Sequence, residues 1–314
     1  MRKFSLIWVV LLSVLSANAS ELEKKIAELA ASHHGHVALY AKNLATGEIA
    51  TLNSARPVQT ASVIKLPLML QAFELVKSGK LKLSLPMLLT KDNQVPGSGI
   101  LTLMDPGLTV SLKDTITLMM TLSDNTATNM LIDVVGLRPT NEMLIRMGMR
   151  NTYFYKKVFK KAEGPMPADQ KQFGLGKTTA EEMARVMESI YRCDLGDREL
   201  CVQMITIMRN QQYRDMLPRY LERGDTSEDL SAIADKIGAL DDVRNDVALV
   251  YTQRGPIVIS IFTYENEDTS WTPENKAEIL IGRLAKTIVD AWSPEGLAAK
   301  ITDPLANANS KIVR

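Results

Sequence analysis

Hydrophobic positions along this chain of 314 residues alternate with the two-residue period of strands near both ends and with the helical period in the middle. The strand patterns cover residues 37–41, 48–52, 233–237, 246–252 and 257–263. Helical patterns cover residues 21–34, 62–77, 113–122, 125–135, 180–191 and 273–292. A single antiparallel sheet built from both ends of the chain, with helices inserted between them, accounts for this order.

This arrangement predicts an α+β fold with two lobes. Residues 20–64 and 212–292 are expected to form a discontinuous sheet lobe, flanked by helices. Residues 65–211 are expected to form an all-helical lobe, and residues 293–314 a polar tail. A chain of this length can bury a core large enough for both lobes.

Residues 1–19 have the pattern of a secretory signal peptide. Two basic residues precede an apolar run, and Ala17-Asn18-Ala19 is a typical cleavage site. A transmembrane anchor is the competing interpretation, but the apolar run is short for a span and no second one follows. We therefore expect a periplasmic or secreted protein that is cleaved after Ala19 and keeps no stable membrane anchor.

Charge and histidine content exclude several function classes. The 37 basic and 36 acidic residues nearly cancel, so a broad attraction to nucleic acid is not expected. The only histidines are His33, His34 and His36, at the end of a predicted helix. This disfavours a metal site and a Ser-His-Asp triad, and we expect neither a metal nor an organic cofactor.

Cys193 and Cys201 are the only cysteines, and they flank a predicted turn between two helices. A disulfide is plausible in an exported protein, and two buried thiols are the alternative.

The candidate chemistry begins at Ser62-Val63-Ile64-Lys65, at the predicted start of a helix. Residues three apart share one helix face, and a lysine with a lowered pKa can take the proton of a serine hydroxyl. Ser123-Asp124-Asn125 and Lys236-Ile237-Gly238 follow in that order. The motifs S-x-x-K, S-D-N and K-T-G characterise class A β-lactamases and penicillin-binding proteins. The chain resembles the class A β-lactamase family from about residue 36 to residue 292.

The resemblance implies a β-lactamase-like fold with the active site between the lobes. Ser62 would be the nucleophile and Lys65 its base, and Ser123 would pass a proton to the leaving nitrogen. The other residues implied are those that would bind substrate: Asn125 for the amide, Lys236 for a carboxylate, Gly238 for close backbone approach, and the backbone N–H of Ala239, with that of Ser62, for the oxyanion. A helix N-cap is a second role for Ser123-Asp124-Asn125.

Three positions depart from the family pattern or stay open. Ile237 stands where the family has a threonine. Glu163 is the expected deacylating base, but the asparagine four residues later is missing, and a solvated loop carboxylate is the alternative. Arg244 is either a second carboxylate anchor or a solvated strand charge. The loop Pro96-Gly97-Ser98-Gly99 also lacks the gate aromatic of many class A enzymes.

We therefore expect a monomeric serine hydrolase that opens a β-lactam amide through an acyl-enzyme on Ser62. The alternatives are a D,D-peptidase or another ester or amide hydrolase acting on a peptidoglycan-like substrate, and a penicillin-binding module that is acylated without turnover. The missing asparagine and Ile237 favour these alternatives.

Overall fold

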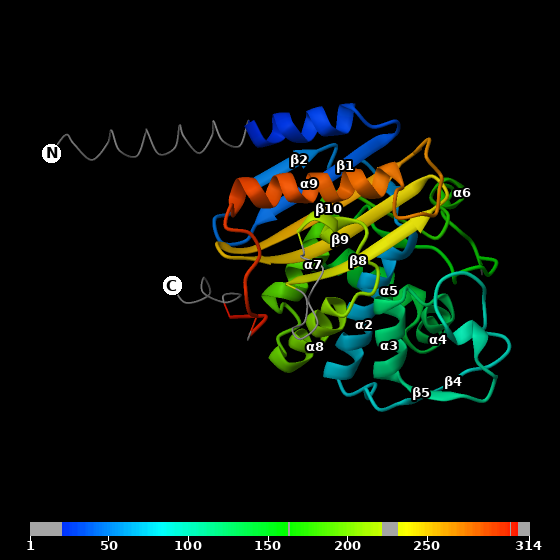
Figure 1. The fold of residues 1–314 in the computed structure, drawn as a ribbon. Coiled ribbons are helices and arrows are strands. Elements are labelled where there is room, and N and C mark those ends of the chain that lie inside the picture. The colour runs from blue at the N-terminus through cyan, green and yellow to red at the C-terminus, as the bar shows by residue number, and fades with distance from the viewer. Residues whose placement is uncertain (1–20, 163, 222–231, 302, 307–314) are drawn as a thin grey trace.

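The computed structural model describes residues 21–162, 164–221, 232–301 and 303–306, and the predicted signal peptide lies outside them. Its main feature is a five-stranded antiparallel sheet in the order β2-β1-β10-β9-β8 (Figure 1). The strands are β1 His36–Asn43, β2 Ile49–Leu52, β8 Ile233–Leu240, β9 Val243–Thr252 and β10 Gly255–Tyr264. Strands from both ends of the chain thus share one sheet, because β1 pairs along its whole length with β10.

Helices connect and cover the sheet. The α-helices are α2 Lys65–Lys77, α3 Leu112–Thr121, α4 Asn125–Val135, α5 Leu137–Arg146, α6 Gln170–Phe173, α7 Ala180–Arg192, α8 Arg198–Arg209 and α9 Lys276–Trp292. Residues 21–31 form a further helix at the start of the described chain. Short 3-10 helices are η1 Ala61–Ile64, η2 Leu101–Leu103 and η3 Leu217–Tyr220. Two small sheets join β3 Val58–Gln59, β7 Gly176–Thr178 and β6 Tyr153–Phe154, and β4 Pro86–Leu88 with β5 Thr109–Ser111.

Both faces of the large sheet are buried, so its strands are apolar on both sides. Along β9, Ala248 and Val250 pack toward α9 and the N-terminal helix, whereas Val247 and Leu249 belong to the core shared with α2 and α7. Figure 1 shows α9 and the N-terminal helix on one face of the sheet and α7 on the other. The sheet therefore forms the middle layer of three.

Helix α2 lies in the centre of the helical region. All nine residues from Lys65 to Phe73 are buried, so the helix is enclosed on every side. Its first turn meets α4, and the 3-10 helix η1 before it packs against β8. The predicted α+β architecture is confirmed, and the start of α2 lies where the helices meet the sheet.

Within the described residues, no helix is both long and apolar enough to span a membrane.

Candidate functional site

Ser62 lies in η1, directly before α2, and its residue is only partly buried. The preceding Ala61 has a left-handed φ of 45°, which is unfavourable for a residue with a Cβ. This turn aims the first residues of η1 at the edge strand β8. Lys65 begins α2 one turn later, so the serine and lysine predicted from sequence share one end of the same buried helix.

Lys65 is completely buried and donates to acceptors from the α3–α4 connection. Its Nζ lies 2.7 Å from the backbone oxygen of Ser123, 3.1 Å from Ser123 Oγ and 2.9 Å from Asn125 Oδ1. Burial lowers the pKa of Lys65 well below its usual value, and the charge of Lys236 lowers it further. The neutral amine, which can accept a proton, is thereby favoured.

Lys236 reaches the same hydroxyl from β8. Its Nζ lies 3.1 Å from Ser123 Oγ and 2.8 Å from the backbone oxygen of Ile237. Burial lowers the pKa of Lys236 to about 7, and the nearby Asp235 and Asp246 oppose that shift. Two lysines from different lobes thus converge on one serine hydroxyl, which can relay a proton between them.

Ser123 and its neighbours are held rigidly. Ser123 has a left-handed φ of 53°. The adjacent Asp124 is 1% exposed, and its carboxylate accepts from the backbone N–H groups of Ala127, Ile100 and Leu101. It therefore caps α4 and ties the 96–101 loop to that helix, and such over-determination sustains strained backbone.

Asn125 borders the cavity from α4 and also contacts the 96–99 loop. Its backbone N–H donates to the oxygen of Ser98 at 3.0 Å, and its Nδ2 donates to the oxygen of Pro96 at 3.1 Å. Together with the Lys65 bond to Oδ1, these contacts fix the amide plane. Asn125 is positioned to orient Lys65 and a bound substrate amide.

Gly238 places β8 directly against the backbone of Ser62. A Cβ at Gly238 would lie 2.8 Å from the oxygen of Thr60 and 3.0 Å from the backbone nitrogen of Ser62. Only a glycine permits this approach. Ala239 follows on the same strand, so the two backbone N–H groups predicted for an oxyanion hole come from elements in contact.

Asn245 is a site-supporting residue that was not predicted from the sequence. It pairs with Gly238 across β8 and β9, and its Nδ2 donates to the oxygens of Gln59 and Thr60 at 3.0 and 3.2 Å. These bonds hold the segment just before the nucleophile. The register of the hairpin was the signal that could have identified it.

Arg244 does not have the position expected of a substrate anchor. It pairs with Ala239, and its side chain points to the face covered by α9. There it is completely buried, donates to Glu278 at 2.9 Å and stacks on Trp271. Arg244 therefore belongs to an internal ion pair, which corrects both sequence interpretations, the carboxylate anchor and the solvated strand charge.

Glu163 lies outside the described residues, so its position is not used. The described part of its loop that borders the site is Val158–Phe159. Asn129 of α4 holds Val158 by two hydrogen bonds, accepting from its N–H at 2.9 Å and donating to its oxygen at 3.0 Å. An asparagine one helical turn after Asn125 was the sequence signal for this clamp.

The two cysteines lie far from this chemistry. Cys193 and Cys201 form a disulfide that closes the turn between α7 and α8. Among the described residues, no group of three or more His, Cys, Asp or Glu is arranged to hold a metal ion.

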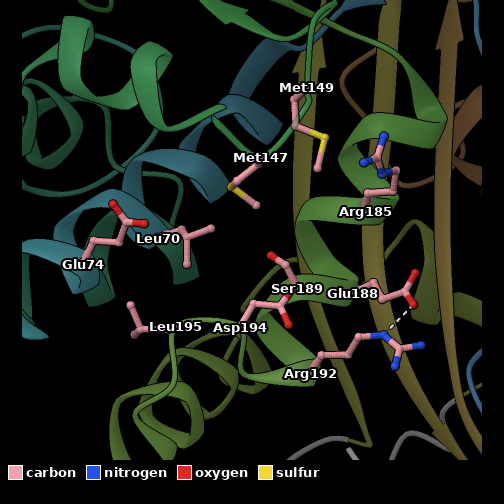
Figure 2. Close-up of a pocket in the computed structure, with 10 residues that line it drawn as sticks. All are labelled: Leu70, Glu74, Met147, Met149, Arg185, Glu188, Ser189, Arg192, Asp194 and Leu195. Carbon is pink, nitrogen blue, oxygen red and sulfur yellow. Dashed lines mark hydrogen bonds and ion pairs between the residues drawn. The ribbon is translucent and has the colours of Figure 1, made fainter. Parts of the chain in front are cut away.

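A separate cavity of about 410 Å³ opens between α2, α7 and the disulfide turn (Figure 2). It is lined by Leu70, Glu74, Met147, Met149, Arg185, Glu188, Ser189, Arg192, Asp194 and Leu195. None of these residues belongs to the site around Ser62, which lies beyond the opposite end of α2.

Comparison with known proteins agrees with this geometry. A beta-lactamase from Sphaerobacter thermophilus DSM 20745 is 26% identical, with 88% of this chain and 96% of that chain covered and a TM-score of 0.73. A PBP-A variant in an acyl-enzyme complex with penicillin-G is 23% identical, with coverages of 87% and 96% and a TM-score of 0.73. A beta lactamase from Xanthomonas campestris pv. campestris str. ATCC 33913 is 19% identical, with coverages of 87% and 98% and a TM-score of 0.74.

These structures share the fold, and the sequence itself carries the family assignment. The model of the beta-lactamase enzyme family matches residues 21–292, which include every element of the large sheet and every residue of the site. This protein therefore belongs to the beta-lactamase enzyme family.

Proposed function

We propose that this protein is a serine hydrolase whose Ser62 is acylated by β-lactam amides and whose acyl-enzyme is hydrolysed slowly. The observation that carries the proposal is the convergence of Lys65 and Lys236 on Ser123 Oγ, at 3.1 Å each, one helical turn from Ser62. This arrangement supports both steps of acyl transfer, the removal of a proton from a nucleophile and its delivery to a leaving nitrogen.

In the acylation step, neutral Lys65 takes the proton of Ser62 Oγ while the oxygen attacks the amide carbon. The electron pair of the carbonyl moves to its oxygen, where the N–H groups of Ser62 and Ala239 stabilise the charge. The C–N bond then breaks, and the proton passes from Lys65 through Ser123 Oγ to the departing nitrogen. The lowered pKa of Lys65 supports its role as the base.

Substrate recognition is proposed to use Asn125 for the amide and Lys236 for a carboxylate. An ammonium on β8 attracts an anionic substrate group, although Ile237 cannot add the hydroxyl that a threonine would offer. β-Lactams and the D-alanyl ends of peptidoglycan peptides both carry such a carboxylate, so either class suits the site.

Slow deacylation is proposed from the described surroundings of Lys65. Its hydrogen-bond partners there are oxygens of Ser123 and Asn125, and no carboxylate of the described chain is among them. The loop residue clamped to α4 is the apolar Val158. General-base activation of a water contributes ~10²–10⁴ in rate, so an acyl-enzyme without it persists.

A rapid β-lactamase with Glu163 as base is the second candidate. The 26% identity to a protein described as a beta-lactamase favours it. The acyl-enzyme of PBP-A with penicillin-G favours the persistent adduct. A D,D-peptidase would combine the same acylation with a peptide substrate.

The deciding experiment incubates protein lacking residues 1–19 with a chromogenic cephalosporin and follows both colour and intact mass. We expect a stoichiometric adduct, slow turnover, and no adduct on Ser62→Ala. Fast hydrolysis that Glu163→Gln abolishes would establish the second candidate instead. Release of D-alanine from a D-Ala-D-Ala peptide would identify a peptidase, and absence of every signal would refute acylation by these substrates.

Export is part of the proposal. Residues 1–19 would direct the protein to the periplasm or outside the cell, where peptidoglycan and β-lactams are encountered. N-terminal sequencing of the mature protein tests this, with Ser20 as the expected first residue.

A further inference from the structure

An aromatic side chain stands at the rim of the site without a role in the proposed chemistry. Phe159 is 64% exposed, although a large apolar side chain gains free energy when it is buried. It also has a left-handed φ of 54°, a conformation that is unfavourable for a bulky residue. Exposure and backbone strain together mark a residue whose position is imposed by its surroundings.

The imposing contacts come from the neighbouring residue. Asn129 binds both the N–H and the oxygen of Val158, at 2.9 and 3.0 Å, and Val158 is buried. The backbone entering Phe159 is therefore fixed on α4, and the aromatic ring is presented at a defined place.

That place is beside the amide of Asn125. A Cβ built on Gly97 would lie 2.7 Å from Asn125 Nδ2 and 3.1 Å from Phe159 Cε2. One point thus contacts both the amide group and the edge of the ring. Because residue 97 is a glycine with a φ of 89°, no side chain from the 96–99 loop occupies the space between them.

We infer that Phe159 is the apolar wall of the substrate site, against which an aromatic or other apolar acyl substituent packs while Asn125 holds the adjoining amide. This inference rests on the proposed acylation of Ser62. The loop at Gly97 leaves the rim open, and the ring arrives from the opposite loop. Phe159 is a specificity-determining residue for substrates that carry such a substituent.

The test compares two β-lactams that differ only in that substituent, penicillin G with its benzyl side chain and 6-aminopenicillanic acid, which lacks the acyl group. The second-order acylation rate constant is measured by intact mass for the wild type, Phe159→Ala and Phe159→Tyr. Phe159→Ala should acylate about two- to tenfold more slowly with penicillin G, the scale of one aromatic contact, and at an unchanged rate with 6-aminopenicillanic acid. Phe159→Tyr should keep the preference.

Equal slowing with both compounds would overturn the inference, since it would mean that Phe159 only supports the loop. An unchanged preference in Phe159→Ala would also overturn it, while leaving acylation of Ser62 standing. Absence of any adduct on the wild-type protein would refute the proposed function itself, and the inference with it. Thermal unfolding of each variant reports separately whether the fold is intact.

Discussion

Adding one methyl group at Gly238 is expected to slow acylation of Ser62 while the fold survives. The added Cβ would meet the oxygen of Thr60 at 2.8 Å and the nitrogens of Ser62 and Val63 at 3.0 Å. Ordinary contacts of a Cβ begin near 3.4 Å. The strand and the nucleophile turn must therefore separate by about half an ångström, since close-packed backbone relaxes only by moving.

The size of the effect follows from that displacement. Misplacing catalytic groups by about 1 Å can cost ~10²-fold in rate, and losing one oxyanion donor costs ~10²–10³-fold. We expect Gly238→Ala to acylate about 10- to 100-fold more slowly than wild type. Overpacking should also lower the free energy of unfolding by about 1–3 kcal/mol.

Gly282→Ala on α9 is the matched control. Its Cβ would lie 2.9 Å from the oxygen of Met216 and 3.0 Å from Tyr220 Cδ2, so it is equally crowded. It lies on the face of the sheet away from Ser62, and its acylation rate should stay within twofold of wild type. Both variants are assayed with penicillin by intact mass and unfolded in urea. If Gly238→Ala acylates as fast as Gly282→Ala, the close approach of β8 does not control the oxyanion site.

Further predictions concern charge, capping and the disulfide. The pKa of Lys236 is about 7, so its ammonium is populated below that pH and lost above it; acylation by carboxylate-bearing β-lactams should fall by about tenfold between pH 6 and pH 9, and a flat profile would argue against Lys236 as the carboxylate partner. Asp124→Ala leaves three backbone donors unpaired and should lower the free energy of unfolding by about 2–4 kcal/mol, with a smaller loss for Asp124→Asn; equal losses in urea titrations would contradict the capping role. Replacing Cys193 and Cys201 by alanine should lower the free energy of unfolding by about 2–3 kcal/mol without changing acylation, and an altered acylation rate would link the turn to the site.

The architecture was predictable because the two hydrophobic periods are strong and separate along the chain. The expected ends of β9 show the limit of this reasoning. Sequence indicated a start at Asp246, whereas the strand begins at Val243. Arg244 and Asn245 are polar yet fully buried, which requires partners, and those partners come from α9 and from the segment before η1. Contacts that distant in sequence leave no local pattern.

The site divides in the same way. The sequence predicts Ser62, Lys65, Ser123 and Lys236 as members of one site, and the structure brings Lys65, Ser123 and Lys236 into direct contact. Arg244 was misjudged because adjacent strand residues point to opposite faces, and one step of register decides between the crevice and α9. The place of Phe159 depends on the clamp from Asn129, which only the tertiary fold creates.

The strand order β2-β1-β10-β9-β8 also governs when reactivity can arise in a growing chain. A chain that stops before residue 233 already holds Ser62, Lys65 and Ser123, but it lacks Lys236 and the long strand that pairs with β1. Its β1–β2 hairpin would expose an apolar edge that invites aggregation. Covalent labelling by penicillin should therefore appear only once synthesis has passed Tyr264, which makes it a reporter of completed chains, and shorter fragments should give no graded activity.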